Sequence, residues 1–255
     1  MSATSHSERQ RALIVNGDDF GRTPGVNRGI IQAHQSGILT SASIMVRWPA
    51  SGEAAAYALG CPDLSLGIHL DLGEWYLAED GWQPVYEVVD LSDHDAVRAE
   101  IANQLGRFHK LMDRTPTHID SHQHVHRVDP TASIVAEFAR RLGCPVRQAA
   151  PGVTYCGDFY GQAADGSPLP EAINPARLIG LLRDLGPGIT ELACHPGADD
   201  DFDSAYGAER CTELMSLCDP SVRAELERSG IVLTSYHKVR SAGVGKSSPT
   251  WVLNA

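Results

Sequence analysis

The sequence predicts an α/β protein, folded as a single-domain, irregular (β/α) barrel of about seven parallel strands. Three observations support this prediction. Short apolar runs typical of buried parallel strands alternate with helical segments, the runs recur at fairly even spacing, and the 255 residues suit a barrel as one domain. An open, doubly wound parallel sheet is the alternative, because it is built from the same alternation.

Seven short runs are predicted to be strands. Most of them are apolar runs of the kind that fits buried parallel strands. In chain order, the strands are expected at 12–16, 42–46, 66–70, 118–121, 145–148, 190–194 and 231–235.

Helices are expected between these strands. The clearest is 97–112, in which the apolar residues share one face. Gly230 is expected to stop the helix predicted at 222–228. Four helices are predicted to begin where a capping side chain precedes a proline, at Thr23-Pro24, Asp129-Pro130, Asn174-Pro175 and Asp219-Pro220.

Two long segments, 75–90 and 154–170, interrupt the alternation. Loops of this length in a compact domain are usually functional or disordered, and the aromatic residues here argue against disorder. Residues 1–10 are predicted to be a disordered N-terminus and residues 240–255 a flexible tail. The barrel domain is therefore expected to span 11–239.

Charge and composition argue against several classes of partner. The net charge is −11 and Lys and Arg form no cluster, which disfavours a nucleic acid or an anionic membrane. No window approaches the roughly 18 apolar residues of a membrane-spanning helix, and no secretory signal is visible. We therefore expect a cytoplasmic protein, and a homodimer on base rates alone.

The densest chemical motif is His-Ile-Asp-Ser-His-Gln-His-Val-His, at 118–126. Its four imidazoles are costly to bury unless something binds them. His122, directly after a predicted strand, is the preferred metal ligand, whereas His118 is expected to be structural. His124 and His126 are predicted to contact the substrate, or alternatively to support the metal ligands from behind. Because His122 and His126 are four residues apart, a ligand pair on a helical turn is an alternative.

Other polar groups are predicted at the same edge of the sheet, where the carboxyl ends of parallel strands meet. Asp18 and Asp19 follow the first strand, His69 lies near the end of the third, and His195 follows the sixth. Taken singly, each has an ordinary explanation as a turn, a cap or a hydrogen-bonded core residue. Taken together, one carboxylate and two imidazoles would form a metal site with open positions, as catalysis needs.

The predicted chemistry is hydrolysis by activated water. A divalent ion lowers the pKa of bound water and polarises a carbonyl oxygen. Asp18 would then be the general base, and His195 would protonate a leaving amine or stabilise an oxyanion. Arg147, at the end of the fifth predicted strand, could orient Asp18, bind the substrate or form a surface ion pair.

These motifs resemble the YdjC/ChbG family of carbohydrate deacetylases, which includes HpnK-like proteins. The resemblance covers roughly residues 13–236. It is carried by Ile-Val-Asn-Gly-Asp-Asp-Phe-Gly at 14–21, Leu-Thr-Ser-Ala-Ser at 39–43, Gly-Ile-His-Leu at 67–70, Pro-Thr-His-Ile-Asp-Ser-His-Gln-His-Val-His at 116–126 and Cys-His-Pro at 194–196.

The resemblance implies a deformed β/α barrel that removes acetyl groups from N-acetylated sugars with one divalent ion. It implies that Asp19, His69 and His122 hold the metal, with Asp18 as the base and His195 as the acid. The family is commonly described with Mg²⁺, whereas two imidazoles suit Zn²⁺ or a similar ion.

The chain departs from the family pattern in a few places. Gly17 stands where alanine is usual and Gln123 where histidine is common, but neither change removes a proposed ligand. The segments after Gly73 and Tyr155 match less closely and would select the substrate. Trp75 and Tyr155 are expected to stack on a sugar ring, although ordinary core packing is an alternative for each.

Two further functions remain open at this point. A related hydrolase could act on another amide or ester, such as a lipid-linked or nucleoside substrate. A non-catalytic, metal-dependent sugar binder is the other, but a binder needs neither an acid nor a base.

Overall fold

A computed structural model describes residues 10–78, 81–198 and 206–243 of the chain. Residues 1–9 and 244–255, within which a disordered N-terminus and a flexible tail were predicted, lie outside the described residues. Helix α8 (Tyr236–Gly243) extends four residues into the segment predicted as tail.

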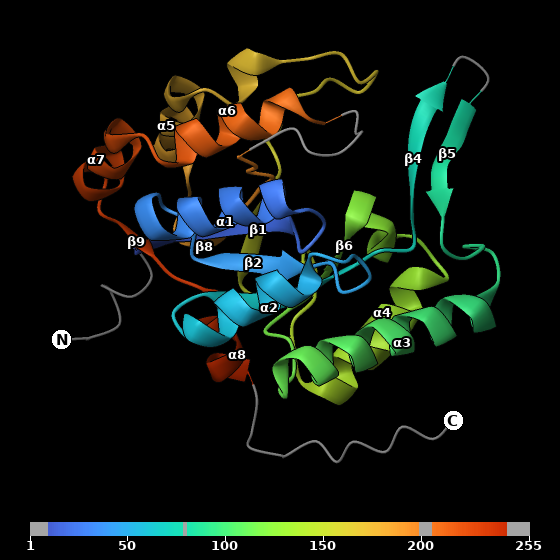
Figure 1. Cartoon of the computed structure of the whole chain (residues 1–255). Coiled ribbons are helices and arrows are strands. Elements are labelled where there is room, and N and C mark those ends of the chain that lie inside the picture. Colours follow the sequence, from blue (N-terminus) through green and yellow to red (C-terminus); the bar gives the residue numbers. More distant parts are fainter. Residues whose placement is uncertain (1–9, 79–80, 199–205, 244–255) are drawn as a thin grey trace.

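A seven-stranded sheet forms the centre of the molecule (Figure 1). Its order is β6-β3-β2-β1-β8-β7, with β9 paired to the start of β1, and its described strand pairs are all parallel. The sheet curls into a half-barrel, which confirms the predicted irregular (β/α) barrel. The strands are β1 (Arg11–Phe20), β2 (Ser41–Ile44), β3 (Ser65–Leu70), β6 (Ile119–Ser121), β7 (Val153–Cys156), β8 (Gly188–Cys194) and β9 (Ile231–Leu233).

The prediction of a strand at 145–148 is wrong. In that segment only Val146 forms a bridge, to Ile119. The strand beside β8 on the side away from β1 is β7, which falls mostly inside the predicted 154–170 loop. Gln148 explains the break, because its φ of 63° is left-handed and ends the extended backbone.

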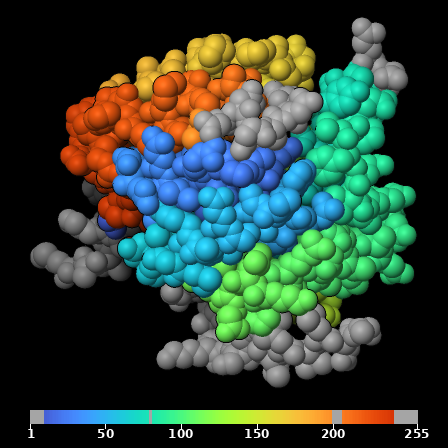
Figure 2. Space-filling model, viewed as in Figure 1, coloured from blue at the N-terminus to red at the C-terminus, as the bar shows by residue number. Residues whose placement is uncertain are grey.

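The segment interpreted as a loop at 75–90 is mainly an antiparallel hairpin. It consists of β4 (Gly73–Ala78) and β5 (Gly81–Glu87), which pair with each other and not with the central sheet. Figure 1 shows the hairpin standing beside the sheet, and Figure 2 shows it as a raised wall at one side of the molecule. Its Trp, Tyr and Val residues favour strands.

Helices pack against the sheet and cover its apolar core. Three of the four predicted caps are confirmed, since Thr23, Asn174 and Asp219 accept hydrogen bonds from first-turn N–H groups. At the fourth, α4 begins one residue later than predicted, at Thr131, but the Asp129 carboxylate still accepts a hydrogen bond from the first-turn N–H of Ser133 at 3.1 Å. The helices before α8 are α1 (Pro24–Ser36), α2 (Ser51–Gly60), α3 (His94–Met112), α4 (Thr131–Leu142), α5 (Pro175–Asp184), α6 (Ala208–Leu217) and α7 (Pro220–Arg228). Short 3₁₀ turns lie at His122–Arg127 and Pro170–Ala172.

The predicted stop at Gly230 is confirmed by its φ of 63°, just after the end of α7. Within the described residues, no helix has the length and apolarity needed to cross a membrane.

Tyr236 connects α8 to the interior of the half-barrel. Its ring is fully buried and stacks on His118 with centroids 3.9 Å apart, and its hydroxyl donates to Glu191 Oε2 at 2.5 Å. His118 therefore has the structural role predicted for it.

Tyr236→Phe is expected to lower the free energy of unfolding by about 1–3 kcal/mol, because it leaves a buried carboxylate oxygen of Glu191 without this donor. Urea denaturation measures the change. Tyr76→Phe is the control, since Tyr76 is 49 % exposed and should change stability by less than about 0.5 kcal/mol. Equal stability of the Tyr236→Phe variant and the wild type would contradict the role of this hydrogen bond.

Candidate metal centre and active site

A cavity of about 880 Å³ opens at the carboxyl edge of the sheet. Asp18 and Asp19 at the end of β1, His69 in β3, His122 after β6 and His195 after β8 all line it. The β4–β5 hairpin and the 155–166 segment form further walls. Parallel strands bring these distant parts of the chain to one edge, as the sequence predicts.

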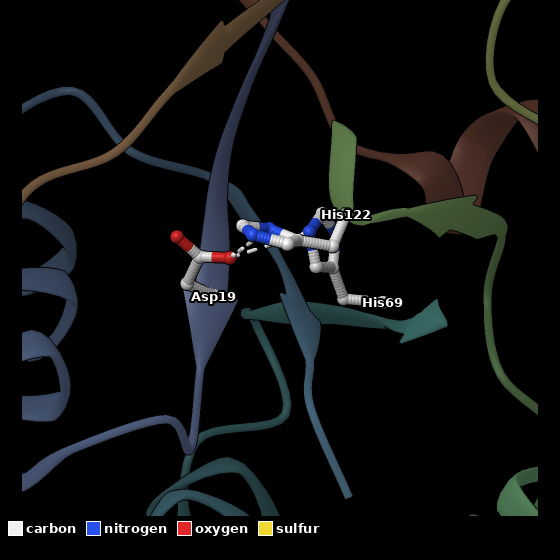
Figure 3. A group of neighbouring side chains, drawn as sticks. All are labelled: Asp19, His69 and His122. Carbon is white, nitrogen blue, oxygen red and sulfur yellow. Dashed lines mark ion pairs between the residues drawn. The ribbon is translucent and has the colours of Figure 1, made fainter. Parts of the chain in front are cut away.

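Asp19, His69 and His122 converge on one point of the cavity. Asp19 Oδ1 lies 3.3 Å from His69 Nε2 and 3.2 Å from His122 Nδ1. In Figure 3 both imidazoles face this single carboxylate oxygen. The three side chains form a group whose ligand atoms all lie within 4.8 Å of one another.

The donor atoms of this group fit one divalent ion. Ligands bound about 2.1 Å from an ion lie about 3.0–3.4 Å apart in octahedral or tetrahedral geometry, close to the separations at Asp19. Asp19 Oδ1 is buried and makes no hydrogen bond of good geometry in the described part of the chain. His69 Nδ1 lies 2.8 Å from Asp120 Oδ1, a contact that leaves Nε2 to face the site.

A second group, Asp18, His69 and Asp120, also has ligand atoms close together. It is less suited to a cation, because Arg147 already pairs with both of its carboxylates. The Asp19 group therefore remains the candidate metal centre.

Charged neighbours offset the cost of burying the candidate ligands. Burial alone would raise the pKa of Asp19, but Arg210 and His122 hold it well below its usual value. Burial would lower the pKa of His69, whereas Asp120 raises it to about 10. The carboxylate is thus ionised, and a cation would have to displace a proton from the His69 imidazole.

Asp18 lies beside this group and is held rigidly. Arg147 donates to both of its carboxylate oxygens, at 2.6 and 2.7 Å, and Asn16 Nδ2 donates to Oδ1 at 2.8 Å. Burial alone would raise the pKa of Asp18, but the Arg147 guanidinium outweighs it and lowers the pKa below its usual value. Asp18 is therefore ionised at neutral pH.

Arg147 is an interior residue and not part of a surface ion pair. It is 1 % exposed, does not line the cavity, and pairs with Asp120 and Glu191 as well as with Asp18. The prediction that Arg147 contacts the substrate is therefore corrected. Of the three roles predicted for Arg147, its contacts favour the orientation of Asp18.

His195 lies beside Asp18 in the cavity, with Nε2 at 3.8 Å from Asp18 Oδ2. Its backbone N–H donates to Glu213 Oε2 at 2.5 Å, and its Nδ1 lies 3.8 Å from Glu213 Oε1. The ring of Tyr206 packs edge-on against His195, and the Tyr206 hydroxyl donates to Glu213. Glu213 of α6 thus holds the backbone of His195, and Tyr206 packs against its ring.

Three of the predicted substrate-binding side chains line the cavity, namely His124, Trp75 and Tyr155. His124 Nε2 lies 3.2 Å from the Tyr155 hydroxyl. His126 is different: it is 4 % exposed, does not line the cavity, and its Nδ1 lies 2.7 Å from Ser121 Oγ. The prediction that His126 contacts the substrate is therefore corrected: His126 is a buried residue that contacts Ser121.

The alternative ligand pair of His122 and His126 does not form. Gln123 and His124 have φ values of 49° and 56°, which break any continuous helix between the two histidines. His126 belongs to neither of the candidate metal groups found among the described residues.

Several charged neighbours of the site were not predicted from the sequence. Arg210 Nη2 donates to Asp19 Oδ2 at 2.6 Å, and Glu213 holds His195, but α6 carries no motif that marks either. Asp120 could have been found, because alternation along a strand places it on the same face as His118 and His122.

Comparison with known proteins gives consistent matches. The chain matches the family described as YdjC-like protein over residues 12–228. A carbohydrate deacetylase of Geobacillus stearothermophilus is 33 % identical over 256 residues, which cover 89 % of this chain and 98 % of the relative. A chitooligosaccharide deacetylase of Escherichia fergusonii is 34 % identical over 257 residues, with the same shares covered.

Solved structures share the fold. A proposed cellobiose-phosphate cleavage protein from Enterococcus faecalis V583 has a TM-score of 0.71 at 27 % identity, over 90 % of this chain and 99 % of its own. A family 4 carbohydrate esterase from Streptomyces lividans, in complex with acetate, has a TM-score of 0.54 over 88 % and 92 %. At 11 % identity, the latter shows a likeness of fold alone.

Proposed function

The chain belongs to the YdjC-like protein family, and from that premise we propose that it is a metal-dependent hydrolase that removes an acetyl group from an N-acetylated sugar. Relatives that span nearly the same length are named as carbohydrate and chitooligosaccharide deacetylases. The observation that carries the proposal is the convergence of Asp19, His69 and His122 on one point beside Asp18 and His195.

Asp19, His69 and His122 are the residues that would hold the ion. A divalent cation supplies two things in such a site, a lowered pKa of water and polarisation of a carbonyl oxygen. One carboxylate and two imidazoles favour Zn²⁺ or a similar ion, whereas the family resemblance suggests Mg²⁺.

Asp18 is the proposed base. Because Arg147 and Asn16 hold both of its oxygens, its position toward the cavity is fixed before substrate binds. The low pKa of Asp18 keeps it ionised and able to accept a proton, although it also makes the carboxylate a weak base.

His195 is the proposed acid. His195 lines the cavity with its Nε2 near Asp18, while Glu213 accepts a hydrogen bond from its backbone N–H and lies beside the other ring nitrogen. A proton on Nε2 is therefore directed at the cavity, where the amine leaves the acetyl group. The aromatic side chains of Trp75 and Tyr155 supply apolar faces on which a sugar ring can stack.

Acetate release from N-acetylglucosamine oligomers tests the proposal. Acetylated lipids, nucleosides and amino acids, assayed in parallel, separate a sugar deacetylase from a hydrolase of other amides or esters. Turnover of only the non-sugar compounds would redirect the substrate assignment. Calorimetric sugar binding with no acetate formed over hours would support a binder instead.

His195→Gln is expected to slow release of acetate from the amide by about 10²–10⁴-fold, because the departing amine must be protonated. Hydrolysis of 4-nitrophenyl acetate should be affected far less, since 4-nitrophenolate leaves without a proton. The ratio of the two rates is the measurement, and His94→Gln, at the start of α3 and outside the cavity, is the control. An equal loss on both substrates would rule out the acid role.

A further inference from the structure

The β4–β5 hairpin is bonded to the loop that carries His122. The backbone N–H of Trp75 donates to Gln123 Oε1 at 2.9 Å, and Gln123 Nε2 donates to the Trp75 carbonyl oxygen at 2.7 Å. The side-chain amide thus offers one residue of β4 the same acceptor and donor that a neighbouring strand would offer.

The hairpin has a structural need for this partner. It is a two-stranded sheet, so β4 has an edge that no described strand covers. The residue opposite Trp75 in β5 is Pro84, which has no N–H to donate, and the register shifts just before Trp75. The hydrogen bonds of Trp75 to Gln123 therefore join the base of the hairpin to the half-barrel.

Glu74, the hairpin residue before Trp75, contacts His122, the loop residue before Gln123. Glu74 Oε2 lies 3.5 Å from His122 Nε2 and accepts a hydrogen bond from Arg22 Nη2 at 2.5 Å. The other ring nitrogen of His122 faces Asp19. One nitrogen thus points to the candidate metal centre and the other to the hairpin, an arrangement in which a carboxylate orients a ligating histidine.

The loop itself is held in an uncommon conformation. Gln123 and His124 are consecutive non-glycine residues with left-handed φ values, of 49° and 56°. Such backbone persists only when its surroundings fix it. The two amide hydrogen bonds of Gln123 are fixed contacts of this kind.

We infer that Gln123 is a positioning residue. Its two hydrogen bonds to Trp75, called the clamp below, join the hairpin to the loop that carries His122, so that the metal centre and the aromatic cavity wall are ordered together. The hairpin contributes Trp75, Tyr76, Leu77, Trp82 and Val85 to that wall. The inference rests on the metal site in the proposed function. Because coupling between two sites is reciprocal, loosening the hairpin should weaken metal binding, and metal binding should order the hairpin.

Two substitutions separate the clamp from the backbone conformation. Gln123→Asn keeps an amide, and asparagine tolerates left-handed φ well, but its side chain is one methylene too short to make both bonds. Gln123→Glu keeps the length and loses the donor to the Trp75 carbonyl oxygen. Gln162→Ala is the control, because Gln162 lines the same cavity and donates a hydrogen bond to Glu209.

Titration with Co²⁺, followed by visible absorption, reports both affinity and ligand geometry. Both Gln123 variants should bind Co²⁺ about tenfold more weakly than the wild type, with a changed spectrum. Hydrogen exchange of the 73–78 segment should be at least about tenfold faster in these variants. Added Co²⁺ should slow this exchange in the wild type and in Gln162→Ala, but much less in the Gln123 variants.

The outcomes distinguish the clamp from the metal proposal. If the wild type binds no Co²⁺ but the variants still lose protection at 73–78, the metal site is wrong and the clamp stands without its coupling. Wild-type exchange rates and Co²⁺ affinity within twofold in both variants would overturn the inference.

Discussion

Replacing Asp18 by asparagine is expected to reduce acetate release by about 10²–10⁴-fold, because the carboxamide cannot accept the proton that the carboxylate would take. Metal binding should survive, since Asp18 is not one of the three converging ligands. The kinetic loss should appear in kcat more than in KM, because the change affects the reacting atoms. Acetate assays over a range of oligosaccharide concentrations measure both constants.

The control for Asp18→Asn must account for Arg147, which loses a charged partner in the variant. Glu191→Gln also removes a buried carboxylate from Arg147, at 2.8 Å, but Glu191 does not line the cavity. This variant should lose comparable stability, by thermal unfolding, with a much smaller loss of rate. If Glu191→Gln slows the reaction as strongly as Asp18→Asn, the effect comes from the ion-pair network and not from a base at residue 18.

Removal of the divalent ion is expected to have the second large effect. Dialysis against a chelator should abolish acetate release, and adding back Zn²⁺ or Mg²⁺ should restore it, which also indicates which ion serves the enzyme. Retention of full activity by protein that elemental analysis shows to be metal-free would contradict the proposed mechanism.

Two alanine variants within the histidine motif locate the ion. His122→Ala removes a converging ligand and should weaken metal binding by more than the about 10–100-fold typical of outer contacts. His126→Ala is the matched control, because His126 bonds Ser121 and lies outside the candidate metal groups. Its metal content should match that of the wild type. A reversed pattern would move the metal site to His126.

The sequence predicted the architecture well where the signal lies within a few neighbouring residues. The strand–helix alternation and the caps at Thr23, Asn174 and Asp219 rest on short-range chemistry, which the fold preserves. Prediction failed at 145–148, where Pro-Val-Arg-Gln was interpreted as a strand but Gln148 turns the backbone. It also failed at the hairpin, because the pairing of β4 with β5 depends on cross-strand partners.

Arg147 illustrates the same limit within the site. From the sequence, its substrate, surface and orienting roles were equally open. Only the structure shows that Asp18, Asp120 and Glu191 surround its guanidinium, since they come from three separate strands. The partners of a buried charge lie far away in the chain, and spacing alone does not reveal them.

The sequence by itself determined that Asp18, Asp19, His69, His122 and His195 meet at one edge, because parallel strands align their carboxyl ends. The tertiary structure decided how these side chains are held: Arg210 on Asp19, Glu213 beside His195, and the Gln123 contact to the hairpin. Topology follows from periodicity along the chain, whereas orientation follows from contacts between residues that the sequence places far apart.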